Sequence, residues 1–155
     1  SMGVWVASRV FAGHSFPWQM KLAVNGTPFP IDDRRGIPKM IFKGTLEHFS
    51  EDTLARFRRR MCGSSGQTEE LLSPTRTAEE LREELAALAQ GITAYGSSSF
   101  IWDRAIIGNR DKIFPPRNQH EAWQGTEIME TEAEHYETSL FSRLLEGKGE
   151  EWTRH

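Results

Sequence analysis

Four arginines gather within five residues of this chain, at Arg56, Arg58, Arg59 and Arg60. Guanidinium groups in such a cluster can neutralise phosphate. They would therefore suit a phosphorylated protein partner or the phosphate backbone of RNA. The competing interpretation is a solvated helix face, which a sequence pI of ≈ 6.0 favours because nucleic-acid-binding domains are usually basic overall. We predict that these four arginines form the basic surface that binds a partner.

The single cysteine, Cys62, directly follows the arginines, and His48 lies upstream. Neighbouring positive charge would lower the pKa of the thiol, but the negative end of a helix dipole would oppose thiolate formation. Nothing else completes a nucleophilic site there. We therefore expect an inert thiol in a reducing compartment.

A Glu-x-x-His spacing occurs at Glu132 and His135 and would place two metal ligands on one helix face. Metal sites in helix bundles need that motif twice, and here it occurs once. We therefore expect His135 on an exposed acidic face beside Glu134. The remaining candidates show no useful spacing: His14, His120, Asp32-Asp33 and Glu150-Glu151. The sequence predicts no catalytic residue, no cofactor and no metal site.

Five tryptophans are a further distinctive feature. Trp5 and Trp18 lie in segments predicted to be core strands. Trp123 and Trp152 lie in segments with turn residues and charge, where aromatic side chains often anchor interfaces. We predict these two as binding residues; the alternative is that they only fix loops to the core.

The segment Gly63-Ser64-Ser65-Gly66 lacks the lysine and the strand-to-helix context of a phosphate-binding loop. It marks a change of sign, since residues 1–62 carry 10 Lys/Arg against 5 Asp/Glu, and residues 63–155 carry 9 against 17. Two interpretations stay open: a native flexible loop, with Ser73 and Thr75 as phosphorylation acceptors, or an engineered linker. We expect one domain over 3–155, in which 63–66 joins a basic half (3–62) to an acidic half (67–155). Ser1-Met2 resembles the remnant of a purification tag.

The helices and strands that must position these residues are predicted from hydrophobic periodicity and from turn and capping residues. Residues 4–11, 18–24 and 38–44 are rich in β-branched and aromatic residues and predict strands, with Asn25-Gly26 as a hairpin turn. Ser50 and Thr77 are helix caps, predicting helices that end at Gly63 and Gly91. A third helix is predicted from about Thr126 to Gly147. The predicted fold class is α+β, a small antiparallel sheet from the N-terminal half covered by about three helices.

These features predict a non-catalytic protein-interaction or regulatory domain that uses aromatic and arginine-rich patches. The alternative is binding of RNA or a phosphate-bearing ligand through the arginines, and an enzyme of unidentified type comes third. A protein partner is expected, with nucleic acid or a phosphorylated ligand as the alternative. No apolar run reaches the ~18 residues of a membrane helix, so we expect a soluble intracellular protein, in cytoplasm or nucleus, without membrane contact.

Overall fold

The computed structural model describes residues 1–63, 75–147 and 149–153. Its centre is a three-stranded sheet in the order β1 (Leu22–Val24), β2 (Arg104–Gly108) and β3 (Glu127–Thr131). Both strand pairs are parallel, with Ala23 opposite Ala105 and Ile106 opposite Met129. Every residue of β2 is buried, as expected for the middle strand of a parallel sheet.

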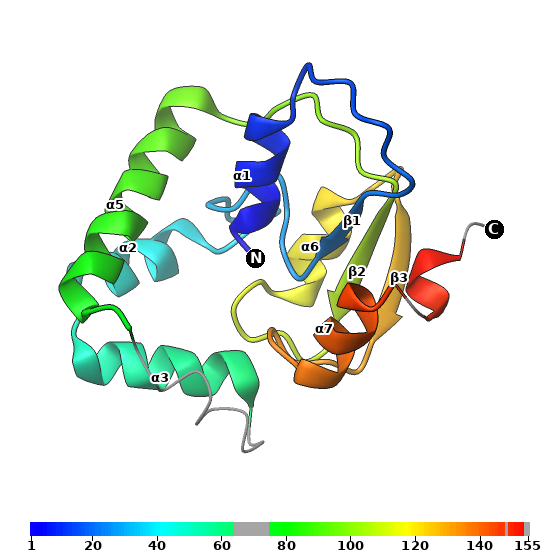
Figure 1. Cartoon of the computed structure of the whole chain (residues 1–155). Coiled ribbons are helices and arrows are strands. Elements are labelled where there is room, and N and C mark those ends of the chain that lie inside the picture. Colours follow the sequence, from blue (N-terminus) through cyan, green and yellow to red (C-terminus); the bar gives the residue numbers. More distant parts are fainter. Residues whose placement is uncertain (64–74, 148, 154–155) are drawn as a thin grey trace.

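Helices form two groups around this sheet (Figure 1). Between β1 and β2 the chain makes α2 (Lys39–Glu47), α3 (Glu51–Cys62) and α5 (Ala78–Tyr95), which gather on one side of the molecule. The other side holds the sheet with α6 and α7, and α1 runs between the two groups. The bounds of the remaining elements are α1 Gly3–Val10, α6 Pro116–Ala122, α7 Thr138–Leu145 and the 3-10 turn η1 Glu150–Trp152.

Local signals explain where α3 and α5 begin. Ser50 and Thr53 exchange side-chain and backbone hydrogen bonds at the start of α3, and Thr77 and Glu80 do so at the start of α5. Each such box satisfies amide groups that a helix end leaves without partners. Both predicted caps are therefore confirmed. Helix α3 also ends at Gly63 as predicted, whereas α5 continues past Gly91 to Tyr95.

The core lies on both faces of β2, because successive side chains of a strand point to opposite faces. Ala105 and Ile107 pack with Val4 and Trp123 on one face. On the other face Ile106 packs with Ala133 of the loop after β3 and with Leu140 and Leu144 of α7. A third cluster, built on Ile37, Phe42, Ile113 and Phe114, joins the sheet end to α2, α3 and α5.

The predicted antiparallel sheet is wrong. Only β1 comes from the N-terminal half, and the helices between the strands act as the crossovers that parallel pairing needs. Asn25-Gly26 does not close a hairpin, because the chain leaves β1 there and runs on to α2. Strand 18–24 is confirmed only over Leu22–Val24.

Three further segments change their secondary structure relative to the prediction. Residues 4–11 form α1, because Val4, Trp5 and Ser8 become one buried helix face against the sheet. Residues 38–44 belong to α2 instead of a strand. The predicted helix 126–147 starts as β3, and only its last part is helical, in α7. In each case packing against neighbouring elements determined the secondary structure, because β propensity depends strongly on context.

The single-domain organisation stays a prediction. Residues 64–66 of the predicted joint, and Ser73, lie outside the described residues, whereas Thr75 is exposed just before α5. Among the described residues, no helix combines the length and apolar character needed to cross a membrane.

Candidate active site

Asp111 lies in the loop that leaves the carboxyl end of β2, and its backbone N–H donates to Gly108 O. Its side chain is fully buried, and its carboxylate accepts four hydrogen bonds. Oδ1 accepts from the backbone amides of Ile113 (2.7 Å) and Phe114 (2.9 Å), and Oδ2 accepts from Gln119 Nε2 (3.1 Å) and from the His135 ring. A buried carboxylate held on both oxygens in this way has one fixed orientation.

His135 follows the carboxyl end of β3, with only 3% of its side chain exposed. Its Nδ1 lies 2.9 Å from Asp111 Oδ2, and its ring stacks on Phe114 at 6.0 Å between centroids. Burial lowers the pKa of His135 below its usual value, whereas the hydrogen bond and the charge of Asp111 raise it. The imidazole therefore stays neutral to lower pH than an exposed histidine, which is the state that a general base requires. The expected exposed position of His135 on a helix is wrong.

Ser1 completes this group at the carboxyl end of β1. Its backbone nitrogen donates to Val24 O (2.8 Å), and its carbonyl accepts from Val4 N in the first turn of α1. Val24, which Ser1 contacts, precedes Asn25, and the Asn25 amide donates to His135 O (2.9 Å) in the loop after β3. The backbone at Gly26 lies very close to Ser1, because a Cβ on Gly26 would be 2.2 Å from Ser1 O. Ser1, Asp111 and His135 therefore lie at the carboxyl ends of three neighbouring parallel strands, the usual place for a site in such sheets.

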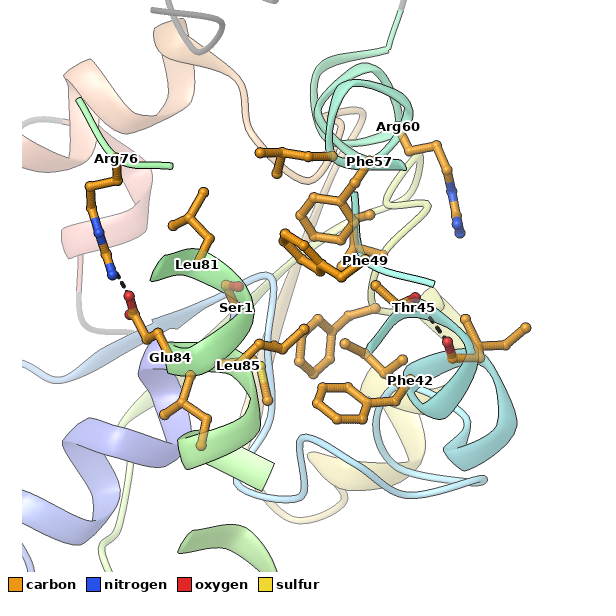
Figure 2. A pocket seen from close by; sticks show the side chains of 17 residues that line it. Ser1, Phe42, Thr45, Phe49, Phe57, Arg60, Arg76, Leu81, Glu84 and Leu85 are labelled. Carbon is orange, nitrogen blue, oxygen red and sulfur yellow. Dashed lines mark hydrogen bonds and ion pairs between the residues drawn. The ribbon is translucent and has the colours of Figure 1, made fainter. Parts of the chain in front are cut away.

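Ser1 is an exposed residue and lines a cavity of ≈ 250 Å³ between the sheet end and the helical layer (Figure 2). Rings of Phe42, Phe49 and Phe57 face Leu81 and Leu85 of α5 across this space. The wall includes Arg60 of α3 and an ion pair between Arg76 and Glu84. The lining is mainly apolar, as in sites that bind hydrocarbon chains.

The predicted arginines lie together on α3, where Arg56, Arg59 and Arg60 are exposed and Arg58 is half-buried. Arg60 alone reaches the cavity, and its guanidinium donates to Lys112 O (2.7 Å), next to Asp111. Their predicted binding of a partner stays a prediction. Cys62 beside them is buried, and burial together with the Glu134 carboxylate raises the pKa of its thiol, in keeping with the expected inert thiol.

The two predicted tryptophans lie apart from this cavity. Trp123 is 4% exposed, packs in the core and donates its indole N–H to Gly26 O (3.0 Å). Trp152 is half-buried in η1 and donates to Leu144 O (3.1 Å). Their predicted role in binding stays a prediction. The described residues contain no group of three or more His, Cys, Asp or Glu suited to a metal ion.

Sequence reasoning missed Ser1 and Asp111, and it considered His135 only as a metal ligand. One signal was present. Ser1-Met2-Gly3 opens a helix as the second half of a G-x-S-x-G nucleophile turn does, and Ser, Asp and His follow in the chain order typical of α/β-hydrolases.

Comparison with known proteins decides the family. The family model described as "Pimeloyl-ACP methyl esterase BioG" matches residues 1–146. The chain belongs to this BioG family. The match includes Ser1 and Met2, so their interpretation as a tag remnant is wrong.

Two relatives and one solved structure are similar to this chain. A malonyl-[acyl-carrier protein] O-methyltransferase of Bacteroides fragilis is 48% identical over 94% of this chain and 30% of its own length. An uncharacterized protein of Haemophilus influenzae is 45% identical over 92% of this chain and 66% of its own length. The crystal structure of BioG from Haemophilus influenzae is 44% identical, with a TM-score of 0.83, over 90% of this chain and 66% of that one. The chain thus spans between about a third and two thirds of the relatives that it matches.

Membership of the BioG family corrects the functional prediction. A family named for an esterase overturns the non-catalytic interaction or regulatory domain, and with it the RNA-binding alternative and the expectation that the protein is not an enzyme. The prediction was wrong because it considered only catalytic residues that lie close together in the sequence. The candidate set is assembled by the ends of separate strands instead.

Proposed function

We propose that Ser1, His135 and Asp111 are the nucleophile, general base and orienting acid of a serine esterase that hydrolyses the methyl ester of pimeloyl-ACP. The observation that carries this proposal is the buried 2.9 Å hydrogen bond between His135 Nδ1 and Asp111 Oδ2, at the strand ends where Ser1 donates to Val24 O. The family description supports the substrate.

The atoms suggest the following course. With Nδ1–H held by Asp111, His135 Nε2 accepts the Ser1 hydroxyl proton as Oγ attacks the ester carbonyl. The Met2 N–H, at the start of α1, is the residue-after-nucleophile donor that stabilises the oxyanion in α/β-hydrolases. Collapse breaks the C–O bond, and His135 returns the proton to the departing methanol. Water then attacks the acyl-enzyme with the same base, which yields the free carboxylate and restores Ser1.

The cavity supports an acyl substrate. Its aromatic and leucine walls would bury methylene groups, and each buried CH₂ contributes about 0.8 kcal/mol of favourable transfer. Away from Arg60 and the Arg76–Glu84 ion pair the walls are apolar, and there an uncharged methyl ester avoids the desolvation cost that a charged carboxylate would carry. This difference favours product release.

The methyltransferase name belongs to a relative of which this chain spans only 30%. The remaining part of that protein has room for a separate activity, so its name does not assign methyl transfer to the residues matched here. The Ser1, His135 and Asp111 group supports hydrolysis, because it supplies a nucleophile and a base.

We further propose that the partner is the acyl-carrier protein and that the arginines of α3 bind it. Arg60 reaches the cavity wall, and its neighbours on α3 extend the positive charge outward. The phosphate of the carrier's phosphopantetheine arm is the group that guanidinium recognises well. This proposal implies work in the cytoplasm, where acyl-carrier proteins act.

A labelling experiment tests the esterase. The purified protein is treated with a fluorophosphonate, and the modified residue is located by mass spectrometry while hydrolysis of pimeloyl-ACP methyl ester is followed. We expect the label on Ser1, no label in Ser1→Ala, and loss of hydrolysis by ~10⁴-fold or more. The control Ser142→Ala changes an exposed serine of α7 and should behave as wild type. Label on another residue, or full hydrolysis by Ser1→Ala, would overturn the proposal.

A further inference from the structure

One buried side chain outside the proposed catalytic group touches the loops that carry it. Asn25 directly follows β1, is 1% exposed and has a φ of 45°, the only positive φ among the described non-glycine residues. Asparagine tolerates this left-handed conformation better than most residues. The conformation turns the chain out of β1 and holds the side chain beneath the site.

Both donor hydrogens and the oxygen of the Asn25 amide are directed at the neighbouring strand ends. Asn25 Nδ2 donates to Glu134 O (3.0 Å) and to His135 O (2.9 Å), in the loop after β3. Its Oδ1 accepts from Gly108 N (2.7 Å) at the end of β2. A rigid planar amide therefore fixes the spacing between the loop of His135 and the strand end that precedes Asp111.

Backbone contacts extend the same junction to Ser1 and Asp111. The carbonyl of Val24, the residue before Asn25, accepts a hydrogen bond from the backbone nitrogen of Ser1, and Gly108 O accepts one from Asp111 N (3.0 Å). Gly108 permits this close approach, because a Cβ there would lie 2.5 Å from Ala133 O and 3.1 Å from Asn25 Oδ1. Each of the three proposed catalytic residues is thus connected to Asn25 through one or two hydrogen bonds between neighbouring backbone segments.

We infer that Asn25 is a positioning residue that holds the loop of His135 in register with Asp111 and Ser1. The inference rests on the proposed function. Asn25 does not touch the reacting atoms. It acts by fixing the His135 backbone, so that the ring meets Asp111 on one side and the serine on the other. A displacement of about 1 Å in such a group can cost on the order of 100-fold in rate.

Two substitutions separate this role from simple stabilisation. Asn25→Gly keeps a backbone that adopts positive φ without strain and removes all three amide bonds. Asn25→Asp keeps the side-chain shape and the acceptor for Gly108 but loses both donors, and it serves if the glycine variant does not fold. The matched control is Thr27→Val, in the same loop: Thr27 is 0% exposed, donates to Arg35 O (2.7 Å) and accepts from Phe29 N (3.1 Å).

The measurements are kcat and KM for methyl ester hydrolysis, the melting temperature, and the downfield proton NMR signal of His135 Nδ1–H, assigned by its loss in Asp111→Asn. We expect the Asn25 variants to lower kcat by about 10- to 100-fold, with KM within about twofold, and to shift or broaden the His135 signal. Thr27→Val should lower only the melting temperature.

Unchanged kcat and an unchanged His135 signal in a folded Asn25 variant would overturn the inference, as would equal effects of Thr27→Val. If the wild-type protein does not hydrolyse the ester, the proposed function fails. The NMR signal still reports whether Asn25 positions His135 in that case.

Discussion

The sheet end and the helical layer of this molecule are built on different principles. At the sheet end, Asp111 and His135 are almost completely buried, and their contacts are directed hydrogen bonds. In the helical layer, α5 has no buried residue, and α3 has only Leu54 and Cys62. Buried polar networks permit one geometry, whereas partly exposed apolar contacts tolerate change.

This difference assigns the two regions different parts of one function. The proposed reacting groups are attached to the ends of packed strands, where small displacements are resisted. The cavity wall that would meet the acyl chain comes largely from helices inserted between β1 and β2 (Figures 1 and 2). Changes at the sheet end should therefore reduce kcat, and changes in the helical layer should mainly affect KM.

The largest expected effect follows from Asp111→Asn. The amide would hold the wrong ring tautomer of His135, and loss of this orientation in serine hydrolases costs ~10⁴-fold in kcat. The control is Asp103→Asn, which changes a carboxylate paired with Lys21 at the other end of β2. Hydrolysis of the methyl ester measures both variants. If kcat of Asp111→Asn falls by less than tenfold, the proposed catalytic role of the sheet end is wrong.

A medium effect is expected from Leu81→Trp on α5. The larger side chain would occupy the cavity and exclude methylene groups, so KM for the pimeloyl ester should rise about tenfold or more while kcat changes little. Leu145→Trp on α7, at a position 88% exposed, is the matched control and should leave both constants unchanged. A selective fall in kcat for Leu81→Trp would show that the helical layer also controls the chemistry.

The smallest effect is expected when Arg58, Arg59 and Arg60 are all changed to glutamine. Binding of the carrier-linked ester should weaken by about 3- to 10-fold, most clearly at low salt, because exposed charges are screened. Hydrolysis of a small methyl ester should not change, and the melting temperature should move little, since charges at a helix end contribute only ~0.3–1 kcal/mol each. Lys43→Gln on α2 is the control.

Two outcomes would count against the arginine proposal. Equal loss for the carrier-linked and the small ester would indicate damage to the site through the contact between Arg60 and Lys112 O. A large fall in melting temperature would show that these arginines hold the fold together.

What the sequence by itself determined was local. The caps at Ser50 and Thr77, the ends of α3 and the strand around Leu22–Val24 depend on residues within a few positions of one another. Hydrogen bonds between a cap and the residue three positions on form wherever the helix does, so the residue types alone predict them.

Only the tertiary structure decided the sheet direction, the helical state of residues 4–11, and the meeting of Ser1, Asp111 and His135. Each depends on contacts between segments far apart in the chain, which no local pattern encodes. Parallel pairing arises because helices return the chain to the end of the sheet where the previous strand began, and burial between them overrides β propensity. The same burial turned His135, which local charge suggested was exposed, into the buried partner of Asp111.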